Sequence, residues 1–338
     1  MGESGAAPTS TSDVSKLIVA FQGRRIVVVG DAVLDEHVVG RATRLSREAP
    51  VPVLELVERS WRPGAATNAA ANVAALGGRP VMVGVVGDDE PGRRLRAELG
   101  RADVDASGLI VAPDRTTATK TRIMATHASA HPQQVARIDD LPAARVSADV
   151  EQQIVRQVAE LVPTADAVLV SNYRGGVVTP TVLGAALEAA SRHGIPTCVD
   201  TQGDLLSFRG FTLVKSNQPD AEAALGEHLQ EEEAFRRAGS RLLAELGARH
   251  AVITRGADGM SVVGDGGAHA HLAPTNRTDV WDVTGAGDTV IAVLALGLAA
   301  GADLIDAAAL ANAAAGLVVR RIGVATVSPT ELLAALQE

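Results

Sequence analysis

Short runs of apolar, largely β-branched residues recur along the chain, and most of them end in a polar side chain. The first is RRIVVVGD, at residues 24–31. Comparable runs further along are PVMVGVVGD, ADAVLVSN, IPTCVD, TLVKSN and HAVITRG. Because such runs present apolar side chains in both directions, they predict strands that are buried on both faces of a sheet.

Segments with helical spacing separate most of these runs. EPGRRLRAELG and TPTVLGAALEAASRHG are two of them, and the second closes on a His-Gly stop signal. Two more helices are expected near the end of the chain, in DTVIAVLALGLAAG and LIDAAALANAAAGLVVRR. Strands that alternate with helices predict a three-layer α/β/α sandwich with a mostly parallel central sheet.

Two stretches break this alternation. Residues 35–57 and 114–139 alternate polar and apolar side chains and contain no helical face. They predict strands of a small additional β-sheet that forms a lid over the main sheet. The polar start, residues 1–15, is interpreted as a disordered tail. No linker divides the remainder, so residues 16–338 are expected to form one domain with an embedded lid.

Composition and charge exclude several classes of protein. Aromatic residues make up 2% of the 338 residues, which argues against an aromatic platform for nucleic acid. The net charge of -9 disfavours nonspecific binding to DNA or to anionic membranes. One cysteine excludes a disulfide framework, and we find no signal peptide or membrane span. A cytoplasmic protein is expected, in which an anionic ligand is held by a local cluster of donors.

Five polar residues stand where predicted strands end. Since ligands of open α/β sheets bind at the carboxyl ends of the strands, these residues mark a candidate site. They are Asp31, Asn172, Asp200, Asn217 and Thr254.

The stretch DVTGAGD, at residues 282–288, carries the most specific chemistry. Gly285 and Gly287 allow a ligand to approach the backbone closely, and amide groups at a helix start form a hole for an anion. Asp288 could take a proton from a hydroxyl that attacks phosphorus. It could equally be an N-cap that stabilises the helix by about 1 kcal/mol. The motif alone leaves both roles open.

DVTGAGDTVIAVL closely resembles the signature of the PfkB (ribokinase-like) sugar kinases. Over nearly the whole chain, blocks such as RPGAATNAAANVAALG, VLVSNYRGG and VITRGADGMSVV look like those of the bacterial D-glycero-D-manno-heptose 7-phosphate kinases. SREAPVPV and GVATVSPTEL go beyond what all PfkB enzymes share. The resemblance implies a ribokinase-like fold and ATP-dependent phosphorylation of the heptose 7-phosphate at its C1 hydroxyl, which gives the 1,7-bisphosphate, a lipopolysaccharide precursor.

The resemblance also assigns roles to individual residues. It makes Asp288 the catalytic base and Gly285, Ala286 and Gly287 the anion hole. Residues assigned to the sugar phosphate, including three basic ones in the lid, are Asp31, Asp35, Gly64, Asn68, Lys120, Arg122, Arg137 and Asn172. Residues assigned to ATP are Asn217, Thr254, Gly256 and Asn312. Asp220 would hold Mg²⁺ through water, and a monovalent cation such as K⁺ is expected near Asp282, Thr284 and Gly323.

Some positions depart from the family pattern. Asp220 replaces the usual Glu, and Ala65 replaces the second glycine of a Gly-Gly-x-x-Asn segment. Asn172 stands where heptose kinases carry Asp, and Thr201 and Gln202 interrupt an Asp-Pro-Lys-Gly-like run. These changes keep open a PfkB kinase for another sugar or sugar phosphate. A noncatalytic sugar- or nucleotide-binding regulator is a further alternative, although the intact Gly-Ala-Gly-Asp argues against it.

The resemblance further implies a homodimer that forms through the lid strands. Because the chain ends soon after the kinase signature, we expect a separate nucleotidyltransferase to act downstream. No nucleic-acid or membrane partner is expected.

Overall fold

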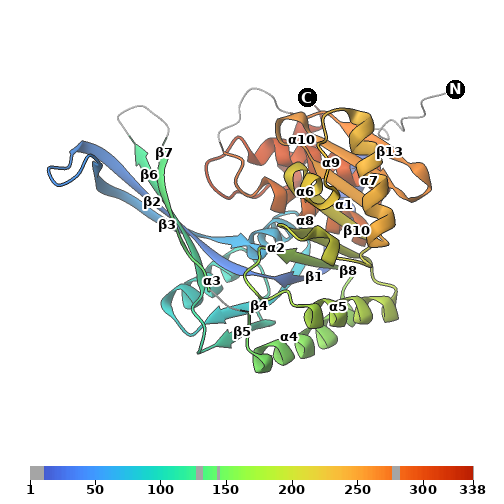
Figure 1. Ribbon diagram of the computed structural model, residues 1–338, viewed down its shortest axis with the longest axis horizontal. Coiled ribbons are helices and arrows are strands. Elements are labelled where there is room, and N and C mark those ends of the chain that lie inside the picture. The colour runs from blue at the N-terminus through green and yellow to red at the C-terminus, as the bar shows by residue number, and fades with distance from the viewer. Residues whose placement is uncertain (1–10, 127–131, 143–144, 276–281, 338) are drawn as a thin grey trace.

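The computed structural model describes residues 11–126, 132–142, 145–275 and 282–337. Within them, a sheet of nine strands runs through the body of the molecule in the order β13-β12-β11-β10-β9-β8-β1-β4-β5 (Figure 1). Neighbouring strands from β11 to β5 are parallel, and β12 and β13 extend one edge antiparallel. The strands are β1 (Arg25–Gly30), β4 (Arg79–Gly87), β5 (Leu109–Ala112), β8 (Ala167–Asn172), β9 (Thr197–Thr201), β10 (Leu213–Asn217), β11 (His250–Thr254), β12 (Met260–Gly264) and β13 (His269–Leu272).

Two layers of helices cover this sheet. Helices α1, α2, α3, α8, α9 and α10 bury one face, and α4 to α7 bury the other. The helices are α1 (Thr11–Ala20), α2 (Ala66–Ala75), α3 (Glu90–Arg101), α4 (Ala148–Leu161), α5 (Pro180–His193), α6 (Gln218–Leu225), α7 (Glu232–Leu246), α8 (Ala286–Ala299), α9 (Leu304–Val318) and α10 (Pro329–Ala335). Short 3₁₀ turns lie at Val162–Thr164, Leu205–Ser207, Gly256–Asp258 and Asp265–Gly267. The three-layer α/β/α prediction is confirmed, and each of the six apolar runs forms a strand.

Helix α8 occupies the middle of the molecule. Residues Val290 to Gly297 are all buried, because α8 packs against α2, α9 and the central strands. A helix that is apolar on every side is stable only in such a position. Its amino end is thereby held at the carboxyl edge of the sheet. No helix in the described part of the chain is long and apolar enough to cross a membrane.

Helix α1 corrects the interpretation of residues 1–15 as a disordered tail. The helix begins at Thr11, so the last five of those residues are helical. Val14, Ile18 and Phe21 recur at spacings of four and three residues, and all three are buried in the core. This apolar face, which packs near α10, is the reason for the order. Residues 1–10 lie outside the described residues.

A second, four-stranded sheet projects from the body of the molecule (Figure 1). Its order is β3-β2-β6-β7, and we call it the lid sheet. Its strands are β2 (Ala32–Leu45), β3 (Pro52–Ala65), β6 (Ala118–Thr126) and β7 (Gln133–Asp140). The predicted small sheet is confirmed, although β3 runs on to Ala65 rather than ending near residue 57. Because β2 starts directly after β1 and β3 leads directly into α2, the base of the lid adjoins the carboxyl edge of the main sheet.

Candidate active site

The five polar residues at the strand ends lie along one edge of the molecule. Asp31 directly follows β1, and the other four lie at or next to the ends of β8, β9, β10 and β11. These five strands are consecutive in the sheet, in the order β11-β10-β9-β8-β1, and are parallel to one another. The prediction that they share one carboxyl edge is therefore confirmed. The amino end of α8 meets this edge, and the base of the lid sheet lies beside it.

Asp288 lies in the first turn of α8 without capping it. The N-cap is Gly285, and the Asp288 carboxylate is instead held by side chains of two other segments. The Asn68 amide donates to Oδ2 at 2.7 Å, and the Tyr173 hydroxyl donates to Oδ1 at 2.6 Å. The N-cap interpretation of Asp288 is wrong, because both of its oxygens are engaged across the site.

Burial of Asp288 has a chemical consequence. The side chain is only 3% exposed, and loss of solvent raises the pKa of Asp288 to about 7. The nearby Asp200 carboxylate also raises this pKa, whereas the hydrogen bonds from Tyr173 and Asn68 and the charge of Lys215 lower it. A carboxylate whose pKa lies near neutrality is suited to act as a general base.

A chain of buried amides fixes the orientation of Asn68. The Thr289 hydroxyl donates to Oδ1 of Asn72 at 2.9 Å, and Nδ2 of Asn72 donates to the backbone and side-chain oxygens of Asn68. With its side-chain oxygen accepting, Asn68 must turn its NH₂ group toward Asp288. The sequence assigned Asn68 to the sugar, and the structure places it on the candidate base.

The turn before Asp288 has no room for side chains at Gly285 and Gly287. Gly285 adopts φ +82°, and a Cβ there would come within 2.8 Å of the Asn68 amide. A Cβ at Gly287 would lie 2.9 Å from the Lys215 ammonium. The first amides of a helix have no partner within the helix and attract anions. At α8, Ala286 and Gly287 line the cavity at the carboxyl edge, and the Ala286 amide also donates to the Val283 carbonyl at 3.3 Å.

Lys215 is a site residue that the sequence analysis missed. It is 5% exposed, and its ammonium donates to Oδ2 of Asp200 at 2.8 Å. Its position beneath Gly287 adds a positive charge next to the α8 amides. The available signal was a lysine inside the predicted buried strand TLVKSN, because a buried lysine needs a partner.

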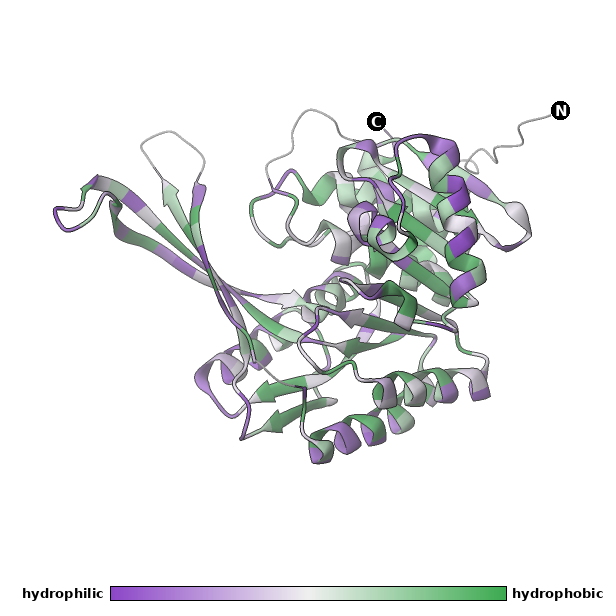
Figure 2. Cartoon of the chain, viewed as in Figure 1, coloured by the Kyte–Doolittle hydropathy of each residue, from purple (hydrophilic) through white to green (hydrophobic). Residues whose placement is uncertain are grey.

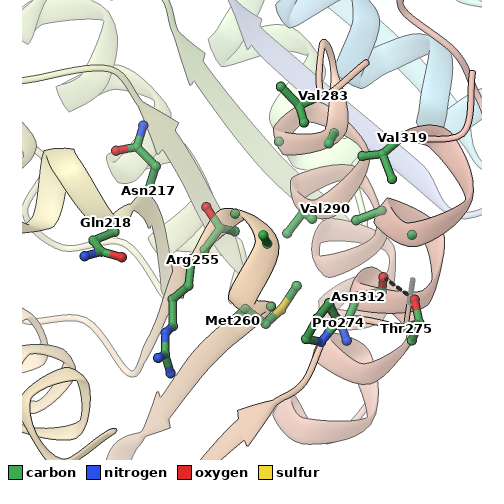
Figure 3. A pocket seen from close by; sticks show the side chains of 18 of the residues that line it. Asn217, Gln218, Arg255, Met260, Pro274, Thr275, Val283, Val290, Asn312 and Val319 are labelled. Atoms are coloured by element: carbon green, nitrogen blue, oxygen red, sulfur yellow. Dashed lines mark hydrogen bonds between the residues drawn. The ribbon is translucent and has the colours of Figure 1, made fainter. Parts of the chain in front are cut away.

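A cavity of about 630 Å³ lies between the strand ends and helices α8 and α9 (Figure 3). Its far wall is apolar, with Met260, Val290 and Val319. The four residues assigned to ATP all line it, and they are Asn217, Thr254, Gly256 and Asn312. Gly287 lines the same cavity. The cavity therefore has the size and apolar wall that a nucleotide needs, and it reaches the α8 amides.

Two of these lining residues also have structural partners. Oδ1 of Asn217 accepts the Asp220 amide at 2.8 Å and so caps α6. Nδ2 of Asn312 donates to the Ala273 carbonyl at 2.6 Å, while the Asn312 carbonyl accepts from the Thr275 hydroxyl (Figure 3). Asn312 therefore fixes the segment that forms one wall of the cavity.

The candidate magnesium ligand Asp220 faces the loop after β9, where its Oδ1 accepts the Gly203 amide at 3.1 Å. Among the described residues, no three His, Cys, Asp or Glu side chains form a group that could hold a metal ion. The residues present fit Mg²⁺ only as an ion carried by nucleotide phosphates, which is its usual mode of binding.

On the sugar side, two carboxylates are held by the protein itself. Asp31 accepts the backbone amides of Tyr173, Gly175 and Val177 at 2.7, 3.0 and 3.3 Å, and it thereby shapes the loop that follows β8. Asp35 forms a buried ion pair with Arg122 at 2.9 Å.

Gly64 lies against Asp35, since a Cβ there would come within 2.7 Å of the carboxylate carbon. The next residue, Ala65, has φ +52°, a strained value for a residue with a side chain. The substitution of the second family glycine therefore leaves the backbone in the glycine conformation.

The three lid cations separate in the structure. The Lys120 ammonium lies 5.4 Å from the centre of the Tyr173 ring, at a small cavity beside the lid. The Arg122 guanidinium is already paired with the Asp35 carboxylate. Arg137 lies on the exposed edge strand β7 and pairs with Asp139 at 2.8 Å. The same cavity is lined by two arginines that the sequence analysis missed, Arg115 and Arg174.

The residues assigned to a monovalent cation come together. The Asp282 carboxylate accepts the amides of Thr284 and Gly323, each at 2.9 Å. It thereby joins the segment before α8 to the loop after α9.

Two of the departures from the heptose kinase pattern contact each other. Nδ2 of Asn172 donates to the Thr201 hydroxyl at 2.9 Å, and Oδ1 of Asn172 accepts the Arg174 amide. These residues end adjacent strands, β8 and β9, so the two departures are in direct contact beside the site.

Solved structures share this architecture. Phosphofructokinase-2 from Escherichia coli, in complex with substrates and products, superposes with a TM-score of 0.78 at 21% identity, covering 94% of this chain and 100% of that one. Arabidopsis thaliana ribokinase, complexed with ribose and ATP, gives 0.73 at 20% identity, covering 94% and 99%. These likenesses show that the fold is ribokinase-like.

Residues 24–331 match the model of the pfkB family carbohydrate kinases. The chain is 42% identical over 325 residues to the bifunctional protein HldE of Geobacter metallireducens, covering 96% of this chain and 65% of that protein. It is 41% identical over 311 residues to HldE of Geobacter sulfurreducens, covering 92% and 62%. The chain belongs to the pfkB family of carbohydrate kinases, phosphotransferases with an alcohol group as acceptor. It spans less than two thirds of the length of these two relatives.

Proposed function

We propose that the chain is an ATP-dependent kinase that phosphorylates D-glycero-D-manno-heptose 7-phosphate at its C1 hydroxyl to give the 1,7-bisphosphate. The observation that carries the proposal is the position of Asp288. Its buried carboxylate lies at the amino end of α8, between the nucleotide-sized cavity and the base of the lid sheet. The site proposed for the phosphoryl donor, ATP, and the carboxylate that would activate the acceptor hydroxyl are thus adjacent.

The chemistry follows from this geometry. ATP would occupy the cavity with its γ-phosphoryl group against the amides of Gly285, Ala286 and Gly287. Asp288 takes the proton of the sugar hydroxyl while the hydroxyl oxygen bonds to the γ-phosphorus, and the bond to the bridging oxygen of ADP breaks. The α8 amides and the Lys215 ammonium would stabilise the charge on the transferring group. Mg²⁺, bound to the phosphates and to Asp220 through water, would supply further charge neutralisation.

The small cavity beside the lid supports a phosphorylated sugar. Lys120, Arg115 and Arg174 line it, and Tyr173 separates it from Asp288. In a protein with a net charge of -9, three basic side chains around one cavity suit a phosphate group. We propose this cavity for the 7-phosphate, in place of the Arg122 and Arg137 that the sequence suggested.

The Asn172–Thr201 contact favours a second candidate, a kinase for a different sugar phosphate. Through its bond to the Arg174 amide, Asn172 holds the loop that carries Tyr173 and Arg174, next to the sugar side of the site. A panel of sugar 7-, 6- and 5-phosphates and free sugars, assayed with ATP by ADP release, distinguishes the two. Heptose 7-phosphate should give the highest kcat/KM. Absence of turnover on it, with turnover on another member, would replace our assignment by the second candidate.

We also propose a homodimer formed through the lid sheet. Most of the exposed large apolar residues of the described chain belong to this sheet or its connections. They are Leu45, Val51, Leu56, Val57, Val135, Ile138 and Leu141. Figure 2 shows hydrophobic and hydrophilic segments interspersed along the strands of this sheet. A sheet with such side chains exposed is stabilised when a second copy covers them. A nucleotidyltransferase that acts downstream stays a prediction.

A further inference from the structure

We propose that Tyr173 is a positioning residue that holds the Asp288 carboxylate in its ionised, reaction-ready orientation. The inference rests on the proposed role of Asp288 as the base and goes beyond it. Tyr173 lies in the block VLVSNYRGG, whose resemblance to the family assigns no role to the tyrosine.

The tyrosine is fixed at both of its ends. Its backbone amide donates to Oδ2 of Asp31 at 2.7 Å, and its hydroxyl donates to Oδ1 of Asp288 at 2.6 Å. Its ring packs against a small apolar cluster of Val33, Ala65 and Ala118 at the base of the lid sheet. Asp31 thus fixes the position of the Tyr173 phenol, and the phenol in turn fixes the orientation of the Asp288 carboxylate.

The two donors leave room for the substrate. Asn68 engages Oδ2 and Tyr173 engages Oδ1, so the carboxylate cannot rotate without losing one of these bonds. Each carboxylate oxygen can accept a second hydrogen bond. A sugar hydroxyl can therefore approach a carboxylate that is already oriented, which is the advantage of a preorganised base.

The two hydrogen-bond donors also lower the pKa of Asp288, which burial raises. The titratable groups that face Asp288 are Asp200 from β9, Lys215 from β10 and Tyr173 from the loop after β8. Burial and Asp200 favour the protonated acid, whereas Tyr173, Asn68 and Lys215 favour the carboxylate. Removal of the phenol hydroxyl should therefore raise the pKa of Asp288, and a stronger donor should lower it.

The composition of the chain permits a direct test, because Tyr173 is its one tyrosine. Growth on 3-fluorotyrosine would therefore alter this side chain alone, making its phenol more acidic and a stronger donor. Tyr173→Phe removes the donor and keeps the ring. The acid limb of the pH dependence of kcat/KM for ATP-dependent sugar phosphorylation should move to higher pH in Tyr173→Phe, by on the order of one pH unit. It should move to lower pH in the fluorinated enzyme.

Opposite shifts would establish the positioning role, since a purely structural role predicts no such pair. An acid limb that stays in place in both enzymes, or moves the same way in both, would overturn the inference and leave the proposed function intact. If Tyr173→Phe does not fold, the fluorinated enzyme and its ¹⁹F signal decide. That signal should shift when Asp288→Asn is introduced, and an unchanged signal would also overturn the inference. Full activity of Asp288→Asn would instead refute the proposed function.

Discussion

At the scale of single residues, the Asp288 carboxylate is held by the Asn68 amide and the Tyr173 hydroxyl, and the Lys215 ammonium lies beside Gly287. Gly285, Gly287 and Asp288 were recognised from one motif, because that motif combines a bare turn with an acid. Tyr173 and Lys215 were missed, because their importance arises only when β8, β10 and α8 meet at one edge. Conversely, Arg122 and Arg137 were assigned to a phosphate because their carboxylate partners were not apparent from the sequence.

The raised pKa of Asp288 predicts a pH dependence. The base is active when ionised, so kcat/KM should fall about tenfold per pH unit below its pKa of about 7 and level off above it. The second ionisation of the sugar phosphate lies near pH 6, about one unit lower, and can be followed separately by ³¹P chemical shift. A profile that remains flat down to pH 5 would contradict the role of Asp288.

The strained conformation of Ala65 predicts a stabilising substitution. Ala65 has φ +52° and ψ -131°, which costs on the order of 1–3 kcal/mol, whereas a glycine adopts it freely and loses about 0.4–1 kcal/mol more in backbone entropy on folding. Ala65→Gly should therefore increase the free energy of unfolding by about 1 kcal/mol in urea titrations. Ala69→Gly, inside α2, should have the opposite effect. A loss of stability in Ala65→Gly would show that the turn is not strained.

At the scale of elements, the sequence predicted the strands of the main sheet well. These runs are short, rich in β-branched residues and bounded by Gly, Asn or Asp, and this combination distinguishes buried parallel strands from buried helices. The beginning of α1 was missed because its polar residues Thr11, Ser12 and Ser15 resemble those of a disordered tail. Its packing depends on α10, more than 300 residues later, which local composition cannot reveal.

The lid sheet predicts a contrast between two of its ion pairs. Arg122→Met would leave the Asp35 carboxylate buried without its partner and should reduce the free energy of unfolding by about 3–5 kcal/mol. Arg137→Met removes an exposed pair from the same sheet and should change it by at most about 1 kcal/mol. Urea unfolding of both variants measures the difference. Equal effects would mean that the Arg122 pair is not buried in solution.

At the scale of the whole molecule, alternation of strands and helices was sufficient to predict the sandwich. The position of the lid beside the carboxyl edge was not predictable from the hydrophobic pattern. It arises because β2 follows β1 directly and β3 leads directly into α2. In this arrangement Tyr173 lines the small cavity beside the lid, Gly287 lines the nucleotide-sized cavity, and the Tyr173 phenol is hydrogen-bonded to Asp288, in the same turn as Gly287.

The proposed dimer is tested by a charge placed on the lid. Ile138 is 57% exposed on β7, and Ile138→Glu should shift the molar mass in light scattering from dimer toward monomer. Val19, 66% exposed on α1, provides the control, because Val19→Glu should leave the mass unchanged. A wild-type chain that is monomeric at micromolar concentration would refute the dimer.

The central claim is that Asp288 deprotonates a sugar hydroxyl for transfer of the ATP γ-phosphoryl group. The most direct test is ³¹P NMR of heptose 7-phosphate with ATP and Mg²⁺, incubated with the wild type, with Asp288→Asn, and with Asp139→Asn as an exposed-carboxylate control. The account predicts a 1,7-bisphosphate signal with the wild type and with Asp139→Asn, and a rate about 10²–10⁴-fold lower with a folded Asp288→Asn. Undiminished bisphosphate formation by Asp288→Asn would contradict it.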